Sequence, residues 1–173
     1  YLFNIIKPNL LGKIYEQFLT KKLTVENEKI TLSNKKDYAD RAIVSTPIEI
    51  VKYIVEKTLK PLCENKTPSE ILDLKIADIA CGSGVFLEEA FDYLVKYCEN
   101  WYENNKKEYL LELSPDNRKL PLEDKKNILL SCIYGIDIDV HAVEVSKFSL
   151  LIKLIENETE PSVATVCPIL PNL

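Results

Sequence analysis

Residues 76–86 constrain the fold of this chain more than any other stretch. They read as a short apolar strand that ends at Asp78, a tight turn that contains Gly82 and Gly84, and the start of a helix. Glycine is rare here, with four in 173 residues, so two in one turn indicate a backbone geometry that other residues avoid. Glycine also lets backbone N–H groups approach a ligand, and a helix start offers unpaired donors and a positive dipole end. The stretch therefore predicts a strand, a ligand-binding turn and a helix.

A second stretch, residues 133–139, has the same character. Its apolar run contains Gly135 and ends in the acids Asp137 and Asp139. Ligands of parallel sheets bind beyond the carboxyl ends of the strands, and we expect Asp78 and Asp137 to lie there. The two acids therefore predict a crevice at one edge of a sheet.

The segments that follow these strands show helical periodicity. Helices are predicted at about residues 85–99 and 140–156, the second with Asp139 as its N-cap, and residues 162–167 look like a third strand. The order strand, helix, strand, helix, strand predicts an α/β fold with a parallel sheet and right-handed crossovers.

The chain before the first strand contains further predicted elements. Apolar spacing indicates a packing helix over residues 9–22. Residues 23–42 are polar and charged, and a short strand or hairpin is suggested around residues 24–25 and 30–32. We divide the chain into an N-terminal helical segment with a linker, residues 1–45, and a domain that holds the sheet, residues 46–173.

Another helix is predicted from Thr46 to about Leu59. Thr46 has the side chain of an N-cap, and Glu49 completes a capping box. Pro61 is expected to end this helix. The residues expected to form its buried stripe are Ile48, Val51, Ile54 and Val55. Residues 99–127 are highly charged and are interpreted as a surface excursion with a short helix that packs back onto the body.

Composition excludes several classes of protein. A net charge of −5 with two arginines argues against a free-standing nucleic-acid-binding module, because such modules are usually basic. The five cysteines are widely spaced without a C-x-x-C pair, which argues against a disulfide framework or a zinc site and favours the reducing cytoplasm. No apolar run approaches the length of a membrane span. The chain begins at Tyr1 and has no methionine, so we expect a fragment of a longer protein.

Two common nucleotide-binding patterns do not match the glycine turn. A dinucleotide fingerprint needs a third glycine where Leu87 stands, and an acid about 20 residues further on is missing too. A P-loop needs Gly-Lys-Ser/Thr after the turn, which is also absent. Cys81, within the turn, has no evident basic partner and is interpreted as a small packing residue, not as a nucleophile.

Four segments resemble, in order, motifs of adenine-N6 DNA methyltransferases that use S-adenosylmethionine. Residues 78–87, D-I-A-C-G-S-G-V-F-L, resemble the cofactor motif D-P-A-C-G-S-G-x-F-L, with Ile79 in place of the commoner proline. Residues 46–51, T-P-I-E-I-V, resemble the T-P-x-x-[IV]-V motif that precedes it in enzymes of gamma-like motif order. Residues 133–139 resemble the second acidic motif of this family. Residues 11–19, L-G-K-I-Y-E-Q-F-L, look like the upstream helix of large type IIG restriction–modification methyltransferases.

This resemblance implies the fold and the cofactor. We expect part of a Rossmann-like class I S-adenosylmethionine-dependent methyltransferase sheet, truncated and preceded by a helical N-terminal segment. The residues implied to bind the cofactor are Thr46, Asp78, Ala80, Cys81, Gly82, Gly84, Phe86, Asp137 and Ile138. No metal ion and no membrane are expected to take part.

The resemblance also implies a role for each side chain. Backbone N–H groups of the glycine turn would face the methionine part of the cofactor, and Asp78 would take up its ammonium directly or through water. Thr46 would contact the carboxylate at a helix start, where anions are favoured. Asp137 would accept hydrogen bonds from both ribose hydroxyls, Ile138 would lie against the adenine, and Phe86 would form the pocket floor.

Other interpretations of these residues stay open from the sequence. Thr46 also suits a helix cap, and Asp78 is also suited to satisfy the donors of its own turn. Asp139 competes with Asp137 for the ribose, because either acid can be the N-cap alone. We favour Asp137, since acids at strand ends point toward the crevice. Phe86 suits the core as well as the pocket.

Catalysis in this family uses an N/D/S-P-P-Y/F loop, which holds the target amine of a flipped base. No P-P-Y or P-P-F sequence occurs in this chain, so we expect no catalytic residue in it. We expect a cofactor-binding fragment of a DNA adenine-N6 methyltransferase from a restriction–modification system, inactive alone, whose DNA contacts lie in other regions of the parent protein. The alternatives are the cofactor-binding part of a protein or RNA amine methyltransferase, or a non-catalytic interaction relic.

Overall fold

The computed structural model describes residues 14–15, 21–26, 29–34, 46–114, 117–156, 158 and 170–173, which form a mixed α/β fold. The helices are α2 (Ile48–Cys63), α3 (Pro68–Ile71), α4 (Val85–Asn105), the 3-10 helix η3 (Lys107–Tyr109), α5 (Leu122–Cys132) and α6 (Val140–Ile155). The strands are β1 (Lys21–Glu26), β2 (Lys29–Asn34), β3 (Ile76–Asp78), β4 (Leu111–Ser114), β5 (Asn117–Lys119) and β6 (Ile133–Gly135). None of the described helices is long and apolar enough to cross a membrane.

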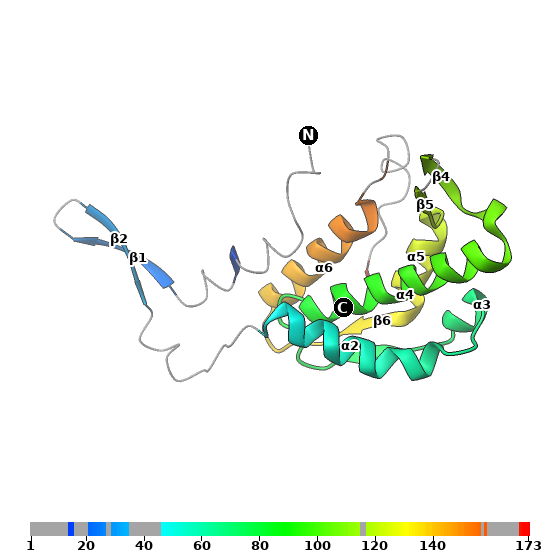
Figure 1. The fold of residues 1–173 in the computed structure, drawn as a ribbon. Coiled ribbons are helices and arrows are strands. Elements are labelled where there is room, and N and C mark those ends of the chain that lie inside the picture. The colour runs from blue at the N-terminus through cyan, green and yellow to red at the C-terminus, as the bar shows by residue number, and fades with distance from the viewer. Residues whose placement is uncertain are drawn as a thin grey trace.

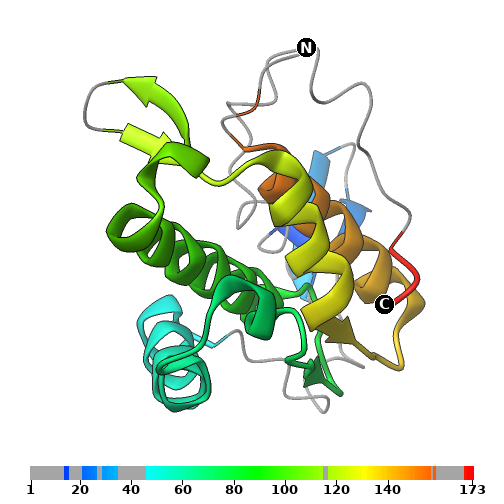
Figure 2. The same cartoon turned by 90° about the vertical axis from the view of Figure 1, so that its right-hand side faces the viewer.

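Helix α4 lies at the centre of the helical body. Figures 1 and 2 show it between α2 on one side and α5 and α6 on the other. Leu87, Phe91 and Leu94 of α4 are almost completely buried and belong to the same core as Val51 of α2 and Leu150 of α6. Complete burial of such a side chain contributes roughly 1.5–3 kcal/mol, so this apolar stripe fixes the position of α4.

Strands β3 and β6 pair in parallel, which confirms the predicted pairing of the two strands. The chain between them passes through α4 and α5. The other edge of β6 is covered near the C-terminus, where the backbone N–H of Gly135 donates to the carbonyl of Asn172 at 3.1 Å. The side-chain amide of Asn172 also donates to the carbonyls of Leu130 and Ile133. Because the two strands run in the same direction, Asp78 and the segment after Gly135 are neighbours.

Strands β1 and β2 form the hairpin suggested for residues 23–42. They are antiparallel, with Thr24 opposite Thr31, and the hydroxyls of these two side chains lie 3.0 Å apart. Figure 1 shows the hairpin apart from the helical body.

The predicted helix over residues 9–22 is only partly described. Residues 14–15 are helical, but residues 21 and 22 belong to β1, so the predicted end of the helix is wrong. The cause is the hairpin ladder, which extends back to the pair Lys21–Asn34. The other residues of that helix, like the strand predicted at 162–167, lie outside the described part of the chain.

The predicted start of α2 is wrong by one residue, and its capping box is not formed. Helix α2 begins at Ile48 with Pro47 in the N-cap position, and no side chain caps it. The backbone N–H groups of Ile50 and Val51 donate instead to the carbonyl of Pro47. Thr46 is therefore not the N-cap that we expected. Pro47 itself has extended backbone angles, with a φ of −54° and a ψ of 137°, so the helix begins only after it.

The predicted end of α2 is also wrong, because the helix continues through Pro61 to Cys63. Within its stripe, Val51 and Val55 are buried as expected, but Ile48 and Ile54 are 40% and 43% exposed. Burial continues instead at Leu59 and Cys63. Because Pro61 stands in the last turn, its missing N–H costs one intrahelical hydrogen bond, and packing against α4 maintains the helix.

Residues 99–127 contain more regular structure than the predicted surface excursion. Helix α4 continues to Asn105, beyond the predicted end at residue 99, and is followed by η3, the β4–β5 hairpin and the start of α5. The ring of Tyr109 in η3 stacks on Tyr102 with 4.3 Å between centroids, which confirms the short helix that packs back onto the body. Leu110, between η3 and β4, is buried.

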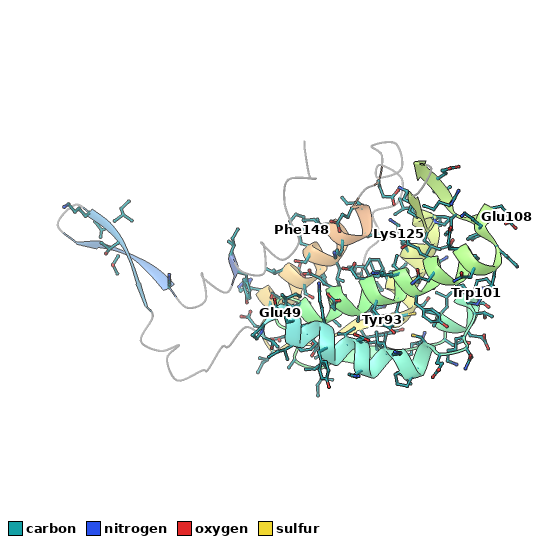
Figure 3. The ribbon with its side chains drawn as sticks, viewed as in Figure 1. Glu49, Tyr93, Trp101, Glu108, Lys125 and Phe148 are labelled. Atoms are coloured by element: carbon teal, nitrogen blue, oxygen red, sulfur yellow. The ribbon has the colours of Figure 1, made fainter. Side chains whose placement is uncertain are left out.

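A buried cluster of charges explains part of this order. The Lys119 ammonium lies 2.6 Å from the carboxylate of Glu158, and Lys125, labelled in Figure 3, also pairs with it. The Glu158 side chain is 3% exposed. Burial raises its pKa, but the hydrogen bonds from the two lysines outweigh this and hold the pKa below its ordinary value. The cluster therefore ties β5 and α5 to the segment that follows α6.

The prediction around α6 is confirmed. The helix spans Val140–Ile155, and Asp139 is its N-cap, with its Oδ1 accepting the backbone N–H of His141 at 2.9 Å. Strand β6, by contrast, ends at Gly135, before the acids of the predicted strand 133–139. The N–H of Ile136 still donates to the carbonyl of Asp78, and the chain then turns away from the ladder. Asp137 therefore lies in the loop between β6 and α6.

Candidate functional site

The turn between β3 and α4 is held by backbone hydrogen bonds and by Asp78. Asp78 Oδ1 accepts the N–H of Ala80 at 3.0 Å, so this acid does satisfy a donor of its own turn. The N–H of Cys81 donates to the carbonyl of Ile136 at 3.0 Å, and the N–H of Gly84 donates to the carbonyl of Cys81 at 2.9 Å. The turn is thus fixed both within itself and to the loop after β6.

Asp137 connects the two loops. Its Oδ2 accepts the backbone N–H of Gly82 at 2.8 Å, and its Oδ1 accepts the N–H of Asp139 at 2.8 Å. A carboxylate has about four lone-pair sites, so Asp137 can accept further hydrogen bonds from a ligand. The structure therefore brings the glycine turn and the second acidic segment together.

Each of the two turn glycines has a positive φ, which side chains rarely adopt. Gly82 has a φ of 54°, and a Cβ there would meet no atom within 4 Å. Gly84 has a φ of 91°, and a Cβ there would lie 2.3 Å from the Oγ of Ser146 on α6. Gly84 is therefore required both by backbone conformation and by the close approach of α6.

Gly135, at the end of β6, is required by packing. A Cβ there would lie 2.7 Å from Cδ1 of Leu87, 2.8 Å from Cδ2 of Leu173 and 3.2 Å from Sγ of Cys81. Its close neighbours belong to α4, to the turn and to the C-terminal segment. This glycine therefore lets α4, the turn and the C-terminal segment pack together beside the place where the turn meets Asp137, which we take as the predicted crevice.

The loops that follow β3 and β6 carry exposed apolar side chains. Ile138 is completely exposed, Ile79 is 78% exposed and Ile136 is 62% exposed. A group of apolar side chains at the carboxyl ends of strands is suited to the flat face of a ligand ring.

An apolar cavity of about 340 Å³ lies between α2, β3 and the start of α4. Phe86 and Asp78 both line it, together with Ile54 and Leu59 of α2. Phe86 is half-buried, so it contacts both this cavity and the core cluster. Asp78 therefore lies beside an apolar cavity.

Thr46 is not joined to the rest of the predicted site. Its side chain makes no hydrogen bond to any residue in the described part of the chain. The structure thus brings together the turn residues Ala80, Cys81, Gly82 and Gly84 with the acids Asp78 and Asp137, and it leaves Thr46 at the start of α2.

The cysteines of the described chain are free and buried. Burial raises the pKa of the Cys81 thiol, and the nearby carboxylates of Asp137 and Asp78 raise it further. This thiol stays protonated near neutral pH, which fits a packing residue and not a nucleophile. Among the described residues, no group of three or more His, Cys, Asp and Glu side chains is placed to hold a metal ion.

Glu88, in the first turn of α4, is an unusual buried acid that faces α6. It is 7% exposed, and burial raises the pKa of its carboxyl to about 7. The Ser149 hydroxyl and the Lys153 ammonium partly counteract this, whereas Asp92 and Glu156 reinforce it. Lys153 forms an ion pair with Asp92 at 2.7 Å. A carboxyl that titrates near neutral pH therefore lies between the two helices whose first turns border the crevice.

Replacing Glu88 by glutamine is expected to remove a pH dependence of stability. Because the pKa of Glu88 is raised from 4.5 to about 7 by folding, its carboxyl is protonated in the folded state and ionised in the unfolded state between these two pH values. The resulting stabilisation is present below the unfolded pKa and is lost as the pH rises through about 7, by roughly 1–3 kcal/mol. Urea unfolding at pH 5 and pH 8 measures this loss of stability.

Glu88→Gln should lose less stability over this range than the wild type, whereas the exposed control Glu56→Gln should behave like the wild type. Equal pH dependence in Glu88→Gln and the wild type would contradict this assignment.

Sequence reasoning missed two residues that contact the predicted site. Ser146 packs against Gly84, and the Tyr15 hydroxyl donates to Asp139 Oδ2 at 2.7 Å. The helical periodicity did not single out Ser146, and it indicated Tyr15 only as one of the apolar residues on a packing face. Gly135 had a usable signal, because a rare glycine stood directly before the acidic segment.

Comparisons with known proteins agree with this arrangement. A family model described as the MmeI DNA-methyltransferase domain matches residues 56–171. Over its full length the chain is 41% identical to the type II restriction enzyme and methyltransferase RM.Eco57I of Escherichia coli, of which it covers 17%. It is 27% identical, over 97% of its length, to a protein of Methanocaldococcus jannaschii provisionally named type II restriction enzyme and methyltransferase RM.MjaORFECS2P, of which it covers 16%. The chain therefore spans about one sixth of the length of the curated relatives it matches.

Proposed function

This chain belongs to the family of MmeI DNA-methyltransferase domains, and we propose that it is the S-adenosylmethionine-binding part of a DNA adenine-N6 methyltransferase in a restriction–modification enzyme. In this proposal residues 46–173 are part of a Rossmann-like methyltransferase sheet, and residues 1–45 are a helical segment and linker. The observation that carries it is the hydrogen bond of 2.8 Å between the N–H of Gly82 and Asp137. It joins the glycine turn after one parallel strand to the acid after its neighbour, where such sheets bind ligands.

The residues at this crevice fit the nucleoside part of the cofactor. Asp137 retains acceptor sites for the two ribose hydroxyls beyond the two backbone N–H groups that it already accepts. Ile138 exposes its whole side chain and supplies an apolar surface for the adenine ring. These residues bind and orient the nucleoside, while the bound cofactor supplies the electrophilic methyl group on its sulfonium.

The remaining residues suit the amino-acid part of the cofactor. No side chain caps α4 at Gly84, so we assign its first N–H groups and positive dipole end to this part. The N–H groups of Ala80 and Cys81 already donate to Asp78 and to the carbonyl of Ile136, so these two residues would line the site without donating to the cofactor. Asp78 uses Oδ1 for its own turn and has Oδ2 for the ammonium. Thr46 does not serve as a cap of α2, which leaves its hydroxyl for the carboxylate. Phe86 forms a wall beside Asp78.

The family and the names of the relatives favour DNA over a protein or RNA amine as the substrate. The chain itself has a net charge of −5 and no P-P-Y or P-P-F sequence. We therefore place the contacts with DNA and with the target base in other regions of a longer protein, and we expect residues 1–173 alone to be inactive.

Methyl transfer to DNA tests this function. The full-length protein is incubated with DNA and with S-adenosylmethionine labelled in its methyl group, and the nucleosides are then separated. The label should appear in N6-methyldeoxyadenosine, and the chain of residues 1–173 should transfer none.

Each alternative predicts a different result in the same assay. Label in protein or RNA but not in DNA would support another amine substrate and overturn the proposal. Neither transfer nor binding of S-adenosylhomocysteine would support a non-catalytic interaction relic. Turnover by residues 1–173 alone would show that the missing N/D/S-P-P-Y/F sequence is not needed.

A further inference from the structure

The side chain of Asp139 uses both of its oxygens within the protein. Its Oδ1 caps α6 by accepting the N–H of His141 at 2.9 Å, and its Oδ2 accepts the hydroxyl of Tyr15 at 2.7 Å. The hydrogen bond from Tyr15 is the chief reason that the pKa of Asp139 lies below its ordinary value. Tyr15 precedes Asp139 by 124 residues, so this bond joins the N-terminal segment directly to the crevice.

Asp139 in turn holds the acid that faces the glycine turn. Its backbone N–H donates to Oδ1 of Asp137 at 2.8 Å, while Oδ2 of Asp137 accepts the N–H of Gly82 at 2.8 Å. A continuous series of hydrogen bonds therefore runs from Tyr15 through Asp139 and Asp137 to the turn. Each bond in this series has a charged acceptor, and such bonds are shorter and stronger than those between neutral groups.

We propose that Tyr15 is a positioning residue for the cofactor, which holds Asp139 at the start of α6 so that Asp137 alone of the two acids is directed to the ribose. This inference rests on the proposed function, because it takes Asp137 as the ribose acceptor. The sequence alone left Asp137 and Asp139 as alternatives for the ribose, and this inference selects Asp137. It also gives the N-terminal segment a role in cofactor binding.

The physical basis is preorganisation. A loop that is already held in its bound conformation loses less conformational entropy when the ligand binds. Without the Tyr15 hydroxyl, Asp139 keeps its cap but loses its second partner, and the loop that carries Asp137 becomes less restricted. The second carboxylate then also becomes available to compete for the ribose hydroxyls or to repel Asp137.

Three variants of the full-length protein separate this role from general stability. Tyr15→Phe removes the hydroxyl and keeps the ring. Asp139→Ser keeps a good N-cap for α6 but has a side chain too short to reach Tyr15. Tyr109→Phe is the matched control, because it removes the same kind of bond, from a tyrosine to Asp124 Oδ2 at 2.8 Å, far from the crevice along the fold.

Calorimetric titration with S-adenosylhomocysteine is the measurement. Tyr15→Phe and Asp139→Ser should each weaken binding roughly tenfold, and the double variant should lose little more than either alone. Tyr109→Phe should bind like the wild type. The same titration with the 2′-deoxyribose analogue gives the preference for the ribose hydroxyl, which should shrink in Tyr15→Phe. A residue with a merely structural role would leave this preference unchanged.

Two results would overturn the inference while the proposed function stands. If Tyr15→Phe binds S-adenosylhomocysteine with the same dissociation constant as the wild type, the hydroxyl has no role in positioning. A loss that is the same for the ribose and deoxyribose ligands, or that is fully additive with Asp139→Ser, shows that Tyr15 does not act through the two acids. If the wild type itself does not bind the ligand, the proposed function fails, and this inference fails with it.

Discussion

Replacing Gly84 by alanine is expected to abolish binding of S-adenosylhomocysteine and to lower the free energy of unfolding by about 3 kcal/mol. Gly84 has a φ of 91°, and a Cβ there would lie 2.3 Å from Oγ and 3.0 Å from Cβ of Ser146. The substitution therefore strains the backbone and pushes α4 away from α6. Both effects act at the N-cap of α4, beside the N–H groups that we assign to the cofactor. Urea unfolding and calorimetric titration measure the two losses.

Gly82→Ala is the matched control for this prediction. Gly82 also has a positive φ, of 54°, but a methyl group at this position would meet no atom within 4 Å. Only backbone strain should remain, which costs about 1–2 kcal/mol. Adding Ser146→Ala to Gly84→Ala removes the closest contact and should restore part of the lost stability. Equal losses in the two glycine variants, with no recovery in the double variant, would contradict the steric explanation.

Two segments with the same local pattern show how far the sequence could predict this fold. Thr46-Pro47-Ile48-Glu49 and Thr67-Pro68-Ser69-Glu70 both have the pattern of a capping box. At Thr67 the box forms, because its side chain accepts the N–H of Glu70 and the Glu70 side chain accepts the N–H of Thr67. At Thr46 it does not, and α2 begins one residue later. The shared T-P-x-E pattern therefore did not decide the outcome alone. The hydroxyl of Thr67 also lies 3.0 Å from that of Ser69, whereas Ile48 stands at the corresponding position in the first segment.

The parts of the site that depend on neighbours in sequence were predictable. The strand that ends at Asp78, the turn with its two glycines and the cap at Asp139 all follow from residues a few positions apart. The contacts of Gly84 with Ser146 and of Tyr15 with Asp139 join residues far apart in the chain. Periodicity identifies a buried face but not its partner, so these contacts required the structure.

The continuation of regular structure through residues 99–127 was missed for the same reason. Charged residues there indicated a surface segment, but Lys119 and Lys125 are paired with the buried carboxylate of Glu158. A lysine is rarely buried unless it is paired, and the partner in this case follows α6. The composition of a segment therefore did not reveal the order that a distant acid confers on it.

Asp137→Ala is expected to weaken binding of S-adenosylhomocysteine by at least roughly 100-fold. The variant loses the acceptor for two ribose hydroxyls, and the backbone N–H groups of Gly82 and Asp139 lose their partner. Asp137→Asn keeps one acceptor oxygen without the charge and should show an intermediate loss. Asp73→Ala, at an exposed position after α3, is the control and should bind like the wild type.

Calorimetric titration of the full-length protein with S-adenosylhomocysteine, for the wild type and Asp137→Ala side by side, tests the central claim most directly. We expect saturable one-to-one binding by the wild type that is lost in Asp137→Ala, while Asp73→Ala retains it. No binding by the wild type, or equally tight binding by Asp137→Ala, would contradict the assignment of this crevice to the methyl donor.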